Sequence, residues 1–379
     1  MAAADTPTVI PRRSALSRMI RAVSSPYYRY RHAKVLHSLR VGLAMLFSIL
    51  ATTGIDIPHG IWSSVTLLVV IGGLQHHGNI RQKAAERAAG TLLGAAIGLV
   101  LIMQQNMIGS LPLTFVLEAI IAGICAWFAI GKAGYVGLLT AITMCIVAGH
   151  GDNLIDVGLW RTFNVLIGIV IALGFSFAFP LHATYSWRYG LATNLRECAG
   201  IYARLLDGET IGEEEQVRHF VAINKRLVQL RGLMPSVAKE IGVPLTRLEE
   251  IQRLHRSVLS SLELLATGPL MHADAAARAA YAAHCGNEVR AVRAILLSMA
   301  RALRFGHTTN AGIPAAAPLV DAPGGAAGLP PEWQGPYWLG QRLAEQVDRL
   351  RALLLETEPN WDIEGHTRGS RSDAKTARR

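Results

Sequence analysis

HGIWSSVTLLVVIGGLQHHGNIRQKAAERAAGTLLGAAIGLVL, residues 59–101, is the stretch that decides the fold. It carries the apolar run Ile61–Gln75 and most of the run Ala88–Met103, with a short basic segment between them. Four more apolar runs flank it at short intervals: Leu36–Thr53, Leu111–Ile130, Tyr135–Ala148 and Leu159–Phe179. Since a helix needs about 20 residues to cross the hydrocarbon core of a bilayer, this crowding predicts an all-α integral membrane protein with a six-helix unit.

The six runs differ in length. Along the chain, the first, fourth and sixth are long enough to span a bilayer by themselves. The second, third and fifth reach that length only when flanking small or aromatic residues are added to them. A soluble protein has no reason to string six such runs together with gaps this short, so the function has to be argued as a membrane function.

The charge of the chain lies at its two ends. The formal net charge is +10, yet residues 1–40 hold eight Arg and Lys against one Asp, and residues 366–379 hold five against one. The remaining residues hold 24 basic and 25 acidic side chains. Basic tails beside membrane spans follow the positive-inside rule and attract anionic head groups, so membrane lipid rather than nucleic acid is the expected partner.

The loops predict an orientation. Arg81, Lys83 and Arg87 fall in the loop expected after the second run, and Lys132 falls in the loop after the fourth. The loops after the first, third and fifth runs contain neither Lys nor Arg. Because basic loops stay in the cytoplasm, this alternation predicts six spans with both termini on the cytoplasmic side.

The chain changes character after Pro180. Continuous apolar runs stop, and helical periodicity appears in Glu213–Met234, Leu245–Ala266, Ala273–Leu303 and Tyr337–Leu355. The predicted organisation is a basic cytoplasmic or interfacial N-terminal segment (1–34), a six-span transmembrane domain (35–182), a cytoplasmic amphipathic helical domain (183–306), an Ala/Pro/Gly linker (307–335), a C-terminal helix (336–358) and a disordered basic tail (359–379).

The sequence contains no motif typical of an enzyme or a metal site. Nucleotide-binding loops, serine-hydrolase elbows and zinc-protease motifs are absent from it. The four cysteines follow no metal-binding spacing, and the pair His76–His77 has no carboxylate beside it. We therefore expect no catalytic activity, no cofactor and no bound metal. Any transport would run downhill or draw on an ion gradient.

Two features of the third and fourth runs are candidates for function. Gly90, Gly94 and Gly98 recur every four residues, a spacing that lets another helix approach closely, so helix packing is the first interpretation and a substrate path the second. Glu118 lies seven residues into the fourth run, about 10 Å along the helix. A carboxylate at that depth must be paired, hydrated or protonated, which makes Glu118 either a proton carrier or gate, or a neutral packing residue.

The sixth run carries a third candidate group. Arg161, Asn164 and Gly168 share one helix face. Arg161 breaks the loop pattern, because it is basic and near the expected outer end of its span. Its interpretations are a salt bridge with a nearby acidic residue or attraction of an anionic substrate.

The fourth candidate group surrounds the second run. His59 and Trp62 open that run, and Arg87 closes the basic loop that follows it. Their simplest interpretations are a loop histidine, an interfacial anchor and a positive-inside residue. We also count all three among the residues that could line a transport path.

These residues resemble the fusaric acid resistance family, which overlaps the aromatic acid exporters. In that family a Trp-Ser or Trp-Ala pair opens a span, a short basic loop follows, and an Arg-x-x-Gly-Thr-x-x-Gly run comes next. Here those elements are Trp62–Ser63, residues 79–87, and the run from Arg87 through Gly90 and Thr91 to Gly94. The sixth run is similar as well, in Arg161, Asn164, Gly168 and Pro180, so the resemblance covers about residues 35–182.

The resemblance implies a bacterial inner-membrane exporter of aromatic carboxylic acids that uses the proton gradient. Larger relatives carry two membrane units, so a chain with one unit is expected to form a homo-oligomer, first of all a dimer. In this interpretation Arg161 attracts a small organic anion, Glu118 exchanges protons and the glycines of the third run pack moving helices. The alternatives are a passive organic-anion channel and a non-transporting membrane scaffold whose cytoplasmic helices bind a partner.

Overall fold

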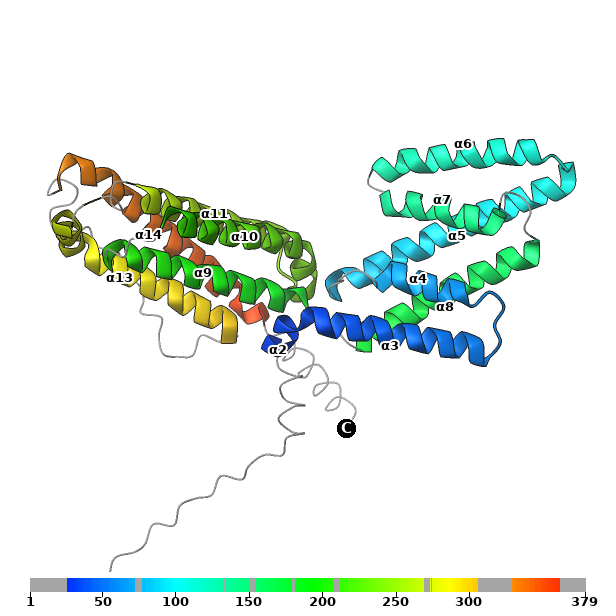
Figure 1. Ribbon diagram of the computed structural model, residues 1–379, viewed down its shortest axis with the longest axis horizontal. Helices are drawn as coiled ribbons and strands as arrows, with labels where there is room; N and C mark the ends of the chain where they lie inside the picture. The colour runs from blue at the N-terminus through cyan, green and yellow to red at the C-terminus, as the bar shows by residue number, and fades with distance from the viewer. Residues whose placement is uncertain are drawn as a thin grey trace, which may run out of the picture. The chain divides into compact units, whose positions relative to one another are not determined.

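Helices account for all the regular secondary structure in the part of the chain that the computed structural model describes (Figure 1). The described residues are 26–71, 77–131, 134–149, 154–178, 181–207, 212–268, 273, 275–305 and 329–361. The prediction of an all-α membrane protein is confirmed. The chain divides into two compact units, Met1–Leu181 and His182–Arg379, which we call the membrane unit and the C-terminal unit.

The membrane unit contains the apolar helices. They are preceded by the short α2 (Pro26–Arg31), and they are α3 (Ala33–Gly54), α4 (Ile61–Ile71), α5 (His77–Ile108), α6 (Leu111–Ile130), α7 (Gly134–Ala148) and α8 (Ile155–Ala178). By length and hydropathy, α3, α5, α6 and α8 can each cross a membrane. The helices α4 and α7 have 11 and 15 residues and are about 17 and 23 Å long. The structure thus gives four helices of spanning length and two shorter apolar ones within its described residues.

The short α7 corrects one prediction. Among the described residues, flanking residues do not bring the fifth apolar run to spanning length, because the helix over it is Gly134–Ala148 and adds one residue, Gly134. The residue that follows, Gly149, has a φ of 56°. This left-handed conformation stops an α-helix and is accessible to glycine without steric cost.

The long α5 corrects another. The segment expected to be a basic loop is helical from His77 onward, so α5 begins eleven residues before the third apolar run. Residues 82–88 are good helix formers, and Gln82 Nε2 donates to Glu86 Oε1 at 2.8 Å across one turn. Polar residues here mark where the helix leaves the apolar layer, not where it ends. With 32 residues, α5 is about 48 Å long.

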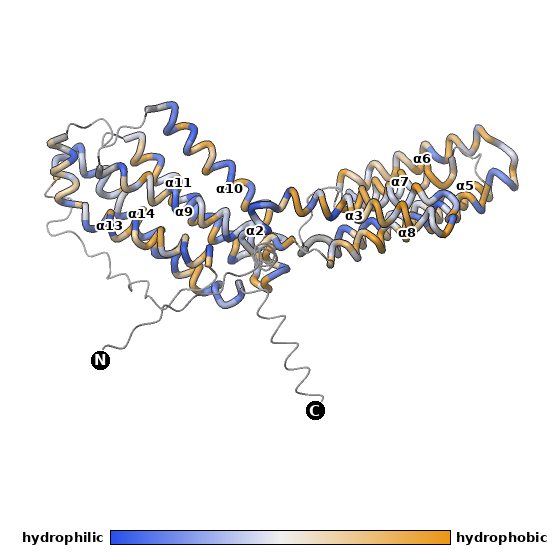
Figure 2. The backbone as a smooth tube through the Cα atoms, turned by 60° about the horizontal axis from the view of Figure 1, so that its bottom comes forward, coloured by the Kyte–Doolittle hydropathy of each residue, from blue (hydrophilic) through white to orange (hydrophobic). Residues whose placement is uncertain are grey.

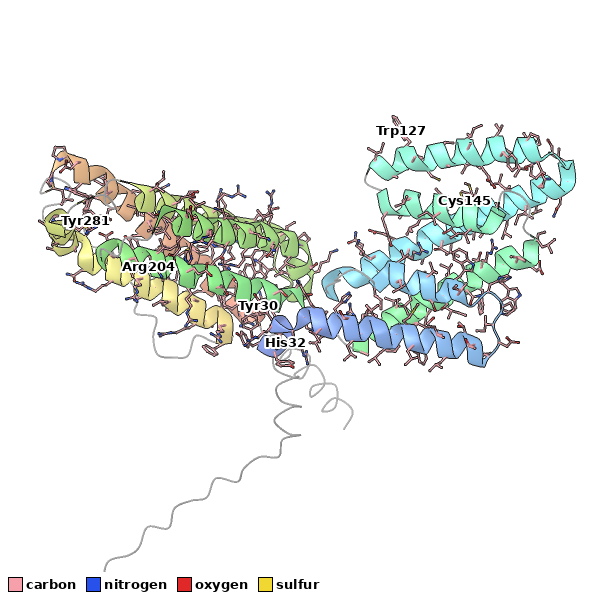
Figure 3. The ribbon with its side chains drawn as sticks, in the orientation of Figure 1. Tyr30, His32, Trp127, Cys145, Arg204 and Tyr281 are labelled. Carbon is pink, nitrogen blue, oxygen red and sulfur yellow. The ribbon has the colours of Figure 1, made fainter. Side chains whose placement is uncertain are left out.

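Helix α5 lies at the centre of the membrane unit. It packs against α7 on one side and α8 on the other, while α6 lies on α7, and α4 and α3 lie on α8 (Figure 1). Most residues of these helices are apolar (Figure 2), and many of their large apolar side chains are exposed, such as Leu50, Val100 and Val170. Trp127 near the end of α6 projects outward with 78% of its surface exposed (Figure 3). Such a surface suits contact with lipid.

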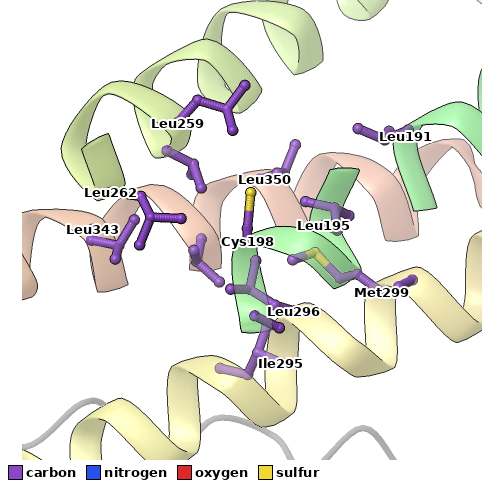
Figure 4. Packing of buried hydrophobic residues seen from close by; sticks show 14 of the residues in the cluster. Leu191, Leu195, Cys198, Leu259, Leu262, Ile295, Leu296, Met299, Leu343 and Leu350 are labelled. Carbon is purple, nitrogen blue, oxygen red and sulfur yellow. The ribbon is translucent and has the colours of Figure 1, made fainter. Parts of the chain in front are cut away.

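The C-terminal unit is a helical bundle around α9. Its helices are α9 (Ala183–Asp207), α10 (Glu213–Ile241), α11 (Leu245–Thr267), α13 (Ala275–Phe305), α14 (Pro331–Thr357) and the short 3₁₀ helix η3 (Glu358–Trp361). Helix α9 contacts α10, α11 and α13, and its residues Leu191, Leu195 and Cys198 lie inside the core (Figure 4).

The last helix belongs to this same core. Leu343 and Leu350 of α14 pack into one cluster with α9, α11 and α13 (Figure 4), and Val347 belongs to the same cluster. The prediction of a separate C-terminal helix over 336–358 therefore needs correction, since α14 begins at Pro331 and its apolar face is buried. The predicted disorder from residue 359 is wrong for the first three residues, because they are helical and Trp361 is buried.

Helices α13 and α14 run parallel. Near their starts, the rings of Tyr281 and Trp333 lie 6.0 Å apart. At their ends, Arg188 of α9 donates to Leu303 O and to Trp361 O. Most of the predicted linker, 307–328, lies outside the described residues, as do residues 1–25 of the predicted N-terminal segment.

Candidate functional site

The structure brings Trp62 of α4 and Arg161 of α8 together. The guanidinium Cζ of Arg161 lies 5.9 Å from the centroid of the Trp62 ring, which is within cation–π range. Trp62 is half-buried and packs against an apolar cluster to which α8 contributes Val165 and Ile169. The aromatic face and the positive charge are therefore neighbours in three dimensions, although they lie on different helices.

Asn164 ties the α3–α4 turn to α8. Its side chain is fully buried, and Nδ2 donates to Trp160 O and to Pro58 O, both at 2.8 Å. Its Oδ1 is also buried and accepts no hydrogen bond from a described residue. Two residues of this turn, Asp56 and His59, have φ values of 54° and 59°, which non-glycine residues rarely adopt. His59 itself is exposed.

The meeting of α4 and α8 depends on Gly168. A Cβ at this position would clash with Ser63 O and lie 2.9 Å from Thr66 Cβ. Only a residue without a side chain lets the backbone of α4 approach α8 so closely. This contact holds Trp62 against the face of α8 that carries Arg161 and Asn164.

Arg161 also reaches the third neighbouring helix. Its Nη1 donates to Ile146 O near the end of α7. Its Nε is buried and makes no hydrogen bond with any described residue. A buried guanidinium N–H without an acceptor is costly, and a carboxylate is the acceptor that a guanidinium binds best. We call Trp62, Arg161 and Asn164 the Trp62–Arg161–Asn164 cluster.

Glu118 lies on α6, on the other side of α7. It is only 8% exposed and interacts electrostatically with Cys145 of α7, which Figure 3 labels. Arg161 bonds to the neighbouring α7 residue Ile146. Helix α7 is thus the element through which Glu118 and Arg161 are connected.

Arg87 lies near the opposite end of the unit. Leu99 and Ile102 of α5 face Gly158, which is three residues before Arg161. Arg87 precedes Leu99 by twelve residues, about 18 Å along the helix. It is 3% exposed and interacts with Tyr135 at the start of α7. The sequence analysis grouped Arg87 with His59 and Trp62, but the fold separates them.

Sequence reasoning missed Arg40. It is 1% exposed on α3, with Nη2 at 2.9 Å from His37 Nδ1. Ala44, one turn later, packs in the same cluster as Ala84 of α5, so Arg40 lies towards the same end as Arg87. The available signal was a basic residue inside the first apolar run.

The glycines of α5 pack against α7. Gly94 faces the backbone of Thr140, and added Cβ atoms at Gly90, Gly94 and Gly98 would lie 2.7 Å from Leu139 Cβ, 2.5 Å from Thr140 O and 2.8 Å from Val147 Cβ. This face is therefore occupied within the chain. A contact with a second copy would have to use another surface.

The C-terminal unit contains a buried polar network. Asn194 Oδ1 accepts from Arg226 Nε at 2.6 Å, and Asn194 Nδ2 lies 3.4 Å from His255 Nε2. Arg226 also pairs with Glu197. His255 is fully buried, and this burial lowers its pKa to about 3. The network joins α9, α10 and α11, and we interpret it as a device for packing these helices in one register.

We predict that His255 makes the C-terminal unit sensitive to acid. In an unfolded chain a histidine takes up its proton near pH 6.5, whereas the buried ring stays neutral down to about pH 3. The unfolded state therefore binds one more proton than the folded state in this window. The free energy of unfolding should fall by about 1.4 kcal/mol for each unit by which the pH is lowered below about 6.5.

Amide hydrogen exchange in α9–α11 of the full chain, corrected for intrinsic rates, measures this effect between about pH 7 and about pH 5. In His255→Gln, the free energy of opening should depend less on pH, because the contribution of this histidine to the slope is gone. His219→Gln on α10 is the control, because its ring is 41% exposed. Equal slopes in the parent and His255→Gln would contradict the prediction.

Two buried cysteines of this unit are chemically quiet. Burial raises the pKa of Cys198 to about 12 and that of Cys285 to about 11. Their thiols stay protonated at neutral pH, so neither supplies a nucleophilic thiolate. No group of three His, Cys, Asp or Glu side chains suited to a metal occurs among the described residues, and His76 and the side chain of His77 fall outside them.

Comparison with known proteins gives two matches. The profile of the fusaric acid resistance protein family (FUSC) matches residues 34–374, which covers both units. The inner membrane protein YeeA of Escherichia coli is 35% identical to this chain over 235 residues. That alignment covers 62% of this chain and 66% of the relative, slightly less than two thirds of the relative's length.

Proposed function

This chain belongs to the fusaric acid resistance protein family, and on that premise we propose that it exports small organic carboxylates, aromatic acids first, from the bacterial cytoplasm. The family is one of membrane transport proteins, and this chain is a multi-pass protein of the bacterial inner membrane. The substrate class, the coupling to protons, the cytoplasmic location of the termini and a dimeric assembly are parts of the proposal.

The observation that carries the proposal is the Trp62–Arg161–Asn164 cluster. An aromatic acid offers a flat apolar ring and a carboxylate. Trp62 supplies an aromatic surface for the ring, and the buried Nε–H of Arg161 supplies a charged donor that has no acceptor among the described residues. The Nε of Arg87 is likewise buried without an acceptor among the described residues, so the aromatic ring beside Arg161 is the feature that favours this cluster as the site for an aromatic acid.

The remaining candidates fit around this cluster. Glu118 is the buried acid of the unit among the described residues, so we assign it the exchange of protons. Arg87 and Arg40 are buried towards the end of the unit that the loop charges assign to the cytoplasm, where they would favour the entry of an anion. Residue His59 lies in the turn that Asn164 holds. A passive channel on the same scaffold is the second candidate, and it differs in needing no pH gradient.

Transport in proteoliposomes tests the proposal, with labelled benzoate and an aliphatic monocarboxylate as the two substrates. We expect benzoate accumulation to require an imposed pH gradient. Arg161→Gln should lower the initial rate by about tenfold or more, which corresponds to the loss of about 1.4 kcal/mol of binding to the anion. Trp62→Leu should raise the KM for benzoate more than that for the aliphatic acid. Trp127→Leu, in which an exposed tryptophan of α6 is changed, is the matched control.

The outcomes separate the alternatives. Equal flux with and without the pH gradient would contradict the proton-coupled exporter and support the passive channel. A folded Arg161→Gln protein that transports both acids at the parent rate would remove the cluster from the substrate path. Absence of flux for either acid in the parent protein would favour the scaffold.

A further inference from the structure

A row of polar side chains leads from the α5–α6 turn towards Glu118. Asn106 at the end of α5 is exposed, Gln104 and Gln105 are half-buried, and Thr114 in the first turn of α6 is fully buried. The rest of this region is apolar, and it contains Leu101, Leu117, Ile121 and Met144. Polar side chains in an apolar layer are costly, so a continuous row of them calls for an explanation.

Thr114 links the two helices. Its hydroxyl oxygen lies 2.7 Å from Gln105 Oε1, 3.0 Å from Gln104 Oε1 and 3.3 Å from Ser110 O. A hydroxyl has one proton, so it donates to one of these oxygens at a time. The amide Nε2 of Gln104 is buried and makes no hydrogen bond with a described residue. The group therefore has spare donors and acceptors at a buried position, which suits a bound water.

Glu118 follows Thr114 by one helical turn. Thr114, Glu118 and Cys125 are the buried residues of α6, so all three lie on the face that α6 turns towards α7 and α5. Side chains four residues apart on a helix have their Cβ atoms about 5–6 Å apart. One water molecule, with a hydrogen bond to each group, can bridge a hydroxyl and a carboxylate at that separation.

Among the described residues, the titratable groups on the helices around Glu118 include two cysteines. Cys145 of α7 is beside it, Cys125 lies two turns away on α6, and α5 has neither an acid nor a base between Ala88 and Ile108. On α8, Arg161 bonds to Ile146 O of α7. Protons that reach Glu118 therefore have a polar route along Gln104, Gln105 and Thr114, and apolar side chains around it.

We propose that Gln104, Gln105 and Thr114 form the proton route between the aqueous side at the α5–α6 turn and Glu118. The two amides orient water and the Thr114 hydroxyl. The hydroxyl accepts a proton from a hydronium ion at the turn and donates its own proton to the bridging water, which passes one of its protons to the carboxylate, so that the hydronium becomes water, the bridging water is restored and one neutral acid results. The use of this proton for export rests on the proposed function, but access of the proton to Glu118 does not.

The labelling of Glu118 by dicyclohexylcarbodiimide tests the route without any substrate. This apolar reagent adds to protonated carboxyl groups within membranes, and peptide mass spectrometry quantifies the product. The full chain is placed in proteoliposomes whose internal and external pH are set independently. The direction of insertion is read from protease access to the α5–α6 turn. We expect labelling of the parent protein to follow the pH on the side of the α5–α6 turn.

Matched variants identify the route. Thr114→Val combined with Gln104→Leu should reduce the dependence on that pH at least tenfold, and Thr114→Ser should keep it because the hydroxyl remains. Thr140→Val is the control, since that α7 hydroxyl donates to Val136 O of its own helix at 2.9 Å. Glu118→Gln supplies the unlabelled background.

Two results would overturn the route. One is labelling that follows the pH of the opposite side. The other is unchanged labelling in the folded Thr114→Val/Gln104→Leu protein. If the double variant fails to fold, Thr114→Ala takes its place, and the comparison with Thr114→Ser decides. A protein that shows the expected labelling but moves no organic acid would contradict the proposed function and leave the route intact.

Discussion

Gly94→Ala is expected to prevent the membrane unit from forming a stable fold. A Cβ at Gly94 would lie 2.5 Å from Thr140 O, 2.7 Å from Thr143 Cβ and 3.0 Å from Met144 N. Two of these atoms belong to the backbone of α7, so no side chain can rotate away to make room. The helices would have to separate along their contact, and overpacking of this kind costs about 3 kcal/mol or more.

Thermal unfolding in detergent, followed by size-exclusion profiles, measures this effect. Gly123→Ala on α6 and Gly174→Ala on α8 are the matched controls, because a Cβ at either position meets no atom within 4 Å. We expect both controls to elute and melt like the parent protein. A Gly94→Ala protein that melts at the parent temperature would show that α5 and α7 are not in such close contact.

Arg188→Gln is expected to loosen the end of the C-terminal bundle where α9 begins. Arg188 is 4% exposed, its Nε and Nη1 donate to Leu303 O and Trp361 O, and its Cζ lies 5.4 Å from the centroid of the Trp361 ring. A shorter neutral amide cannot reach both carbonyls. Since each buried carbonyl that loses its donor costs about 1–3 kcal/mol, we expect a loss of about 3 kcal/mol in the unfolding free energy.

Hydrogen exchange of the last turns of α13 and of η3 in the full chain reports this loss locally. Arg349→Gln on α14 is the control, because that arginine is exposed. Faster exchange in both variants to the same extent, or in neither, would contradict the role of Arg188. Faster exchange confined to Arg188→Gln would support it.

The class of the protein followed from sequence because the free energy of burying apolar surface is local and nearly additive. Six apolar runs indicate helices in lipid whatever their neighbours are, and the family resemblance depended on the same segment. The predicted helices in the C-terminal half were also found, with ends shifted by a few residues, since one-sided apolar periodicity is a property of each segment alone.

The start of α5 was mispredicted for a physical reason. Charge and polarity indicate which residues leave the bilayer, but the backbone hydrogen bonds of a helix continue through polar residues that favour it. The start of α14 was also predicted too late, because residues of low apolar content were taken as irregular chain. Pro331 to Gly335 was counted as linker, yet proline is acceptable in the first helical turn.

The candidate site shows where sequence stops being sufficient. Asn164 bonds to a carbonyl 106 residues earlier in the chain, Trp62 meets Arg161 across two helices, and Arg40 is buried although it lies within an apolar run. By itself, the sequence determined the all-α membrane class, the apolar helices and the types of residue available for anion binding. Only the tertiary structure decided which of those residues meet, because contacts between helices depend on close approach at Gly94 and Gly168, and such long-range geometry is not encoded in any one segment.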